Sequence, residues 1–178
     1  MSDVSILFKA LPPDFSANTL QGGDCTNFVS QALHTGGWQY TASRDDKSTN
    51  TWYVAWNNAK RAFTNSQTWS TAAGFYRRII NDKYEKSVLP TSDLYSLRPG
   101  DIAFLTSGGK SHHTMIVTGY QEKPWWNPFA SYGPLVSYHN GGVNPNTNMP
   151  NLPQQNILLT EVIARSPNDT PVFAKVRS

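Results

Sequence analysis

One cysteine and three histidines are the residues of this sequence best suited to nucleophilic chemistry. Cys25 follows Asp24 in the first turn of a predicted helix whose apolar residues recur at helical spacing. The dipole and unpaired N–H groups of a first turn favour a thiolate, and the same N–H groups can bind an oxyanion. We expect Asp24 to cap the helix and the Cys25 N–H to contribute to an oxyanion hole. The alternative is an inert thiol that packs like alanine.

A thiolate nucleophile needs an acid/base partner that passes a proton to the leaving amine, and histidine is the usual choice. His112 and His113 open a predicted strand, so only one of them can face the cysteine helix. His113 shares its side with Met115 and Val117, the more apolar side, which we expect to face the core. His139 ends the next predicted strand, where it could orient the imidazole of His113.

The remaining sequence predicts the elements that must position these residues. With 178 residues, 38% of them hydrophobic, the chain can bury a core as a single domain over 1–178. Helices are expected in the first half, at 25–35 (stopped by Gly36-Gly37), 52–63 and 71–81. Strands are expected in the second half, at 101–106, 112–120, 134–139, 157–164 and 172–176. Helices followed by strands with hairpin-length gaps indicate an α+β fold with an antiparallel sheet of about five strands.

Several classes of protein are disfavoured. The histidines lack HExxH spacing and there is no CxxC pair, so we expect no metal, and no glycine-rich phosphate loop suggests a cofactor. Lysines and arginines are scattered singly, which argues against a nucleic-acid binder. No apolar run approaches the ~20 residues of a membrane helix. The N-terminus lacks the pattern of a Sec signal peptide.

Five segments resemble, in order, the motifs of the bacterial putative amidase-domain family, a branch of the NlpC-like cysteine peptidases. They are GGDCTNFVSQALHTGGW, TWYVAW, LRPGDIAF, HTMIVTG and LVSYHN, spread over roughly residues 20–142. The resemblance implies a papain-like fold, with the cysteine helix packed on an antiparallel sheet that carries the histidines. It implies Cys25 as nucleophile, His113 as base and His139 as the orienting residue. It also implies hydrolysis of an amide or peptide bond in peptidoglycan through a thioester, by an N-acetylmuramoyl-L-alanine amidase or an endopeptidase.

The biological setting and the exact reaction stay open at this stage. We expect a toxin that is cytoplasmic before export and reaches the periplasm or cell wall of a rival bacterium without a Sec signal, with an immunity protein as partner. An autolysin domain, an acyltransferase or deamidase of proteins, and an inactive glycan-binding module are the alternatives. The insert QEKPWWNPFASYG carries Trp125 and Trp126. We expect this loop to be clamped onto the domain by its own aromatics, although the tryptophans could instead stack on a sugar or peptide.

Overall fold

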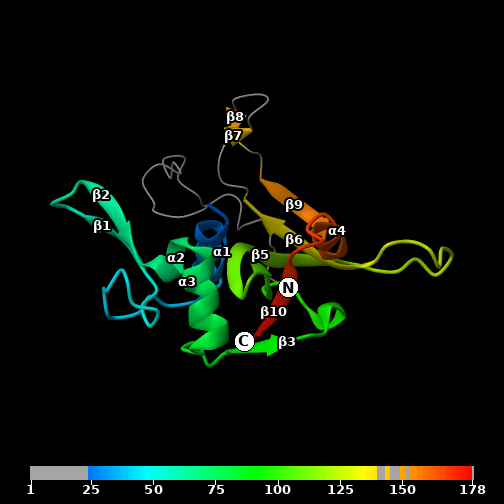
Figure 1. Ribbon diagram of the computed structural model, residues 1–178, viewed down its shortest axis with the longest axis horizontal. Coiled ribbons are helices and arrows are strands. Elements are labelled where there is room, and N and C mark those ends of the chain that lie inside the picture. The colour runs from blue at the N-terminus through cyan, green and yellow to red at the C-terminus, as the bar shows by residue number, and fades with distance from the viewer. Residues whose placement is uncertain (1–23, 140–142, 145–148, 151–152, 178) are drawn as a thin grey trace.

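The computed structural model describes residues 24–139, 143–144, 149–150 and 153–177, and its centre is one antiparallel sheet (Figure 1). The sheet has six strands, which are, in spatial order, β3 (Val88–Thr91), β10 (Thr170–Val176), β4 (Ile102–Ser107), β5 (Lys110–Gln121), β6 (Gly133–Tyr138) and β9 (Gln154–Leu158). The predicted α+β class is confirmed, and the sheet has more strands than the five expected.

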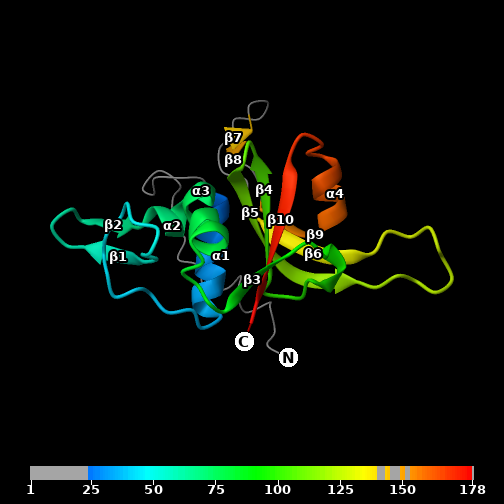
Figure 2. The same cartoon turned by 60° about the horizontal axis from the view of Figure 1, so that its bottom comes forward.

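Helices cover both faces of this sheet (Figures 1 and 2). One face carries α1 (Asp24–Thr35), α2 (Gln67–Ser70), α3 (Ala72–Tyr76) and the π-helical turn η2 (Arg77–Asn81). The other face carries α4 (Leu159–Ala164) and the 3₁₀ turn η3 (Leu94–Ser96). Two further short strands pair with each other, β7 (Val143–Asn144) and β8 (Met149–Pro150). None of the helices in the described ranges is long and apolar enough to cross a membrane.

Alternating residues of β4 and β5 fill a separate core on each face, because successive strand side chains point to opposite sides. The core on the α1 side contains Ile102, Phe104 and Ile116. The core on the α4 side contains Leu105 and Met115. Both sides of β5 are therefore apolar and buried.

Helix α1 begins and ends where the sequence predicts. Its stripe of Phe28, Val29 and Leu33 packs on the sheet. The backbone N–H of Trp38 donates to the Leu33 carbonyl over 3.0 Å, and Gly37 adopts a φ of +108° that favours glycine. The Gly-Gly pair thus ends the helix by a local backbone mechanism.

Two predicted elements are wrong. The segment 52–63 is not a helix but leads into the hairpin of β1 (Val54–Asn57) and β2 (Ala62–Asn65). Trp56 and Phe63, seven positions apart, would share a helix face, yet here they pair across two strands. The run 157–164 is a strand only up to the end of β9, and the rest forms α4. The helical prediction for 71–81 is confirmed by α3 and η2.

The LRPGD motif anchors the centre of the sheet through one buried carboxylate. Asp101 is 3% exposed and accepts the backbone N–H of Arg98 over 2.7 Å. Its other oxygen accepts the N–H of Val176 over 2.8 Å. Gly100, with a φ of +96°, makes the turn that brings the carboxylate back to Arg98. This single side chain therefore joins the turn before β4 to the end of β10.

Candidate active site

Cys25 lies in the first turn of α1, as predicted. Its side chain is 6% exposed, and its Sγ lies 3.7 Å from the Oγ1 of Thr26. Backbone N–H groups in a first helical turn have no acceptor within the helix, so the Cys25 N–H is oriented to serve an anion. The side chain of Asp24 lies outside the described part of the structure, and its capping role stays a prediction.

A threonine pair fixes this first turn against the sheet. Thr26 Oγ1 lies 3.0 Å from Thr114 Oγ1 on β5, and both residues are fully buried. The Thr26 hydroxyl therefore lies between the Cys25 thiol and Thr114. Because Thr114 contacts α1, its side of β5 is the side that faces the cysteine helix.

His113 consequently points to the opposite side of the sheet. It pairs with Leu105 of β4, a residue of the α4-side core, and its ring meets the Tyr138 ring edge-on with centroids 4.7 Å apart. The expectation that the Met115 side of β5 faces α1 is not met. Both sides of β5 are apolar, so the hydrophobic pattern does not indicate which side faces α1. The Thr26–Thr114 bond does indicate it. The catalytic role of His113 is untested by this placement and stays a prediction.

The surroundings of His113 keep its imidazole neutral. Its pKa is lowered from 6.5 to about 4, mainly by burial and also by the neighbouring charge of His112, while Asp169 acts in the opposite direction. His112 itself is half exposed and places Nε2 3.0 Å from Asp169 Oδ1. The two adjacent histidines thus have separate environments, and neither contacts α1 in any interaction found among the described residues.

His139 is the histidine that touches the cysteine helix. Its ring stacks on Phe28 with centroids 4.4 Å apart and an interplanar angle of 17°. Phe28 lies three residues after Cys25, so the two share one side of α1. His139 therefore contacts the side of α1 on which Cys25 lies. The sequence singles out Cys25 and His139, whose catalytic roles stay predictions, but not the threonine pair.

Buried polar contacts hold α1 from the other side. Ser30 Oγ donates to the Trp69 carbonyl over 2.9 Å and accepts from Trp52 Nε1 over 3.2 Å. Trp69 Nε1 donates to Asn27 Oδ1 over 2.8 Å. Two polar residues inside the motif DCTNFVSQ, Asn27 and Ser30, are thus positioning residues, since each bonds a tryptophan behind the helix.

Comparison with known protein families assigns the chain to one of them. The putative amidase domain matches residues 9–151, which is most of the chain and includes Cys25, His113 and His139. The chain belongs to this family. Membership indicates a hydrolase of amide bonds. No curated protein and no solved structure matches the chain.

The amidase domain offers no evident metal centre in the part of the chain that the structure describes. There, no three residues among histidine, cysteine, aspartate and glutamate lie close enough together to hold an ion.

The aromatic insert of the amidase domain is clamped onto the body only at its base, where Tyr132 stacks on Tyr95 with ring centroids 5.2 Å apart. Trp125 is 94% exposed, Trp126 68% and Phe129 93%. The segment between β5 and β6 extends away from the sheet as a long arm (Figure 1). The expectation of a clamped loop is therefore not met for Trp125, Trp126 and Phe129, which stay exposed.

Proposed function

We propose that this amidase domain is a cysteine hydrolase of the NlpC-like type, with Cys25 as the nucleophile. The observation that supports it best is the placement of the sequence's only cysteine in the first turn of α1, on the side where His139 stacks on Phe28. A helix N-terminus stabilises both a thiolate and the oxyanion formed by its attack. An inert core cysteine would not require a histidine at the same end of the helix.

In the proposed reaction, His139 is the general base and acid. It accepts the thiol proton as Cys25 Sγ attacks the carbonyl carbon of the scissile amide, and the oxyanion is stabilised by the Cys25 N–H. His139 then gives the proton to the departing amine, which leaves a thioester on Cys25. A water molecule, deprotonated by the same imidazole, hydrolyses the thioester and restores the thiol.

This proposal gives His139 the role of base that the sequence motif suggested for His113. His139 contacts α1, whereas His113 lies on the α4 side with its ring against Tyr138. In this proposal His113 is a packing residue against Tyr138, and its neutral imidazole suits a partly buried position.

For the substrate we propose peptidoglycan, cut at the muramoyl–alanine amide or at a peptide bond of the stem. The resemblance to NlpC-like peptidases supports this choice, and a net charge of +3 with a pI near 9.0 suits an anionic wall polymer. We further propose that the domain acts as a toxin in the periplasm of a competing bacterium, with an immunity protein as its inhibitor. Expression in a test bacterium with and without a periplasmic signal examines this role, and lysis is expected only with the signal.

Digestion of purified sacculi tests the enzymatic proposal directly. Wild-type protein should release fragments whose masses identify the bond that is cut, and Cys25→Ala should release none. Cys25→Ser, with its weaker nucleophile, should fall close to the alanine variant. Equal release by wild type and Cys25→Ala would exclude Cys25 as nucleophile, and no release by either would exclude peptidoglycan as the substrate.

A further inference from the structure

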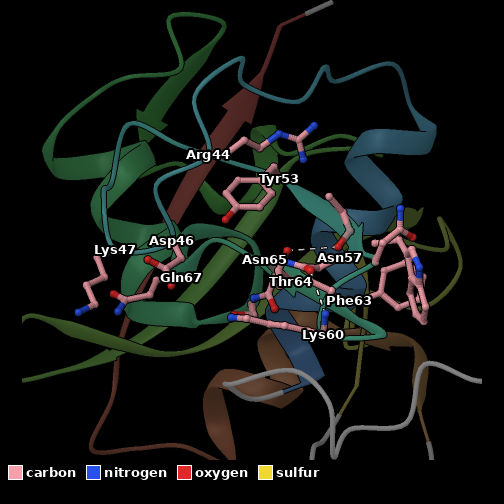
Figure 3. Close-up of a pocket in the computed structure, with 15 residues that line it drawn as sticks. Arg44, Asp46, Lys47, Tyr53, Asn57, Lys60, Phe63, Thr64, Asn65 and Gln67 are labelled. Atoms are coloured by element: carbon pink, nitrogen blue, oxygen red, sulfur yellow. Dashed lines mark hydrogen bonds between the residues drawn. The ribbon is translucent and has the colours of Figure 1, made fainter.

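The β1–β2 hairpin and the loop 44–47 enclose a hollow of about 1000 Å³ (Figure 3). Its lining includes no residue of the candidate active site. We propose that this hollow binds an anionic glycan strand and so provides a polymer-binding site separate from Cys25. The choice of peptidoglycan as the source of that strand rests on the proposed function. The binding itself does not, because it follows from the lining residues alone.

An exposed aromatic pair forms one end of the hollow. Trp56 is 54% exposed and Phe63 37%, although they pair across the hairpin with ring centroids 5.2 Å apart. Figure 3 shows Phe63 at the end opposite Lys47. Large aromatic side chains that are partly exposed on a short hairpin contribute less to the core than buried ones. Their flat faces suit the apolar faces of sugar rings.

Cations dominate the charge of the hollow. Arg44, Lys47 and Lys60 line it, with Asp46 as the only acid among the described residues of the lining. The Arg44 guanidinium lies 5.0 Å from the centre of the Tyr53 ring, which holds it in place. Within the described ranges, none of the three cations belongs to an ion pair. Such cations are available to the carboxylates of a ligand.

Planar amides complete the lining and favour a glycan over a peptide. Asn57, Asn58, Asn65 and Gln67 all border the hollow. Asn57 uses its Oδ1 to accept the Lys60 N–H over 3.1 Å, so its amide NH₂ stays available for a ligand. Each amide offers both a donor and an acceptor, which matches sugar hydroxyl and N-acetyl groups. Aromatic faces beside amides and cations are the combination that a carboxylated amino sugar requires.

Binding by the inactive Cys25→Ala chain tests the inference without turnover. The probes are peptide-free peptidoglycan glycan strands, which carry lactyl carboxylates, neutral chitin oligosaccharides and free stem peptides, measured by calorimetry. We expect the anionic strands to bind best, with affinity that falls as salt rises. Adding Trp56→Ala should weaken binding at least tenfold, and so should Lys47→Glu with Lys60→Glu, which leaves the aromatic pair intact. The matched control Tyr84→Ala removes an exposed aromatic residue outside the hollow and should leave affinity unchanged.

Three outcomes would overturn the inference: no strand binding, strand binding that survives both sets of substitutions in folded variants, or selective binding of stem peptides through the same residues. Thermal unfolding establishes that each variant is folded. Strand binding without sacculus digestion by the wild type would retain this inference and reject the proposed function. Digestion without strand binding would do the reverse.

Discussion

The hydroxyl groups of Thr26 and Thr114 lie 3.0 Å apart in a fully buried position and join the first turn of α1 to β5. This bond decides which side of β5 faces the cysteine helix. It also places a hydroxyl 3.7 Å from the Cys25 Sγ. The orientation of the whole candidate site thus depends on two small polar side chains that are far apart in the sequence.

Replacing Thr114 by valine tests this link. Thr114→Val keeps the shape of the side chain and leaves the Thr26 hydroxyl buried without this partner, so the free energy of unfolding should fall by about 1–2 kcal/mol. Urea denaturation measures it. Thr160→Val, on α4, is the control and should change stability by less than about 0.5 kcal/mol. Equal losses in both variants would show that the threonine pair has no special role.

The histidine roles can be separated by turnover. His139→Ala should lower the rate of sacculus digestion by about 10²–10⁴-fold, because it removes the proposed acid and base. His113→Ala and His112→Ala should retain most of the rate once the fraction of folded protein is taken into account. If His113→Ala instead abolishes turnover in a folded protein while His139→Ala only reduces it, the order that the sequence motif predicted is correct and the proposed role of His139 is wrong.

The partly buried His113 should make stability depend on pH. Its pKa is about 4 in the folded chain against 6.5 as its ordinary value. Between these values the unfolded chain binds a proton that the folded chain excludes, so stability is unaffected above pH 6.5 and falls as the pH drops toward 4. The loss should approach about 3 kcal/mol at most. Urea midpoints across this range should flatten in His113→Gln and keep their slope in His112→Gln. An unchanged slope in His113→Gln would contradict this placement of His113.

Alkylation reports directly on Cys25, since the sequence holds no other cysteine. At pH 7 we expect iodoacetamide to modify the folded chain faster than the urea-unfolded chain, because only the fold supplies the helix N-terminus. Intact mass spectrometry follows the single adduct, and Cys25→Ala should gain none. A folded chain that resists modification while the unfolded one reacts would identify a structural thiol and remove the nucleophile from the proposal.

Removing the buried carboxylate of Asp101 should lower the free energy of unfolding strongly. Asp101→Ala strips acceptors from the N–H groups of Arg98 and Val176 at once, and bonds to a charged acceptor each contribute about 1.5–3 kcal/mol. We expect a loss of about 3–5 kcal/mol in urea denaturation. Asp93→Ala, which removes a cap from an exposed 3₁₀ turn, should cost about 1 kcal/mol. A similar loss in the two variants would contradict the anchoring role.

Local signals explain what the sequence predicted well. The start of α1 follows from the apolar stripe behind Cys25, and its end follows from Gly36-Gly37, where backbone geometry alone decides. β5 was predicted because a long run of β-branched and apolar residues has few other solutions. The α+β class follows from the order of these segments.

Tertiary contacts explain what it could not predict. Trp56 and Phe63 fit a helix face and a hairpin pair equally well by spacing, and only packing chooses the hairpin. The run after Leu158 has strong β propensity, yet Leu159 and Val162 are needed as a helical face over the α4-side core. The side of the sheet toward which His113 points depends on the contact between the Thr26 and Thr114 hydroxyls. These residues are far apart in the sequence, so no local pattern encodes the contact.

The central position of β10 has a consequence for synthesis on the ribosome. β10 pairs with both β3 and β4, and β3 has no other partner in the sheet. Until Thr170–Val176 has emerged, β3 is unattached and one side of β4 presents unpaired backbone groups, the kind of edge that invites aggregation. Pairing at such long sequence separation is also slow. A nascent chain that lacks β10 also lacks Ala174, a residue of the core against which the cysteine helix packs, so this core is complete only after translation has passed β10.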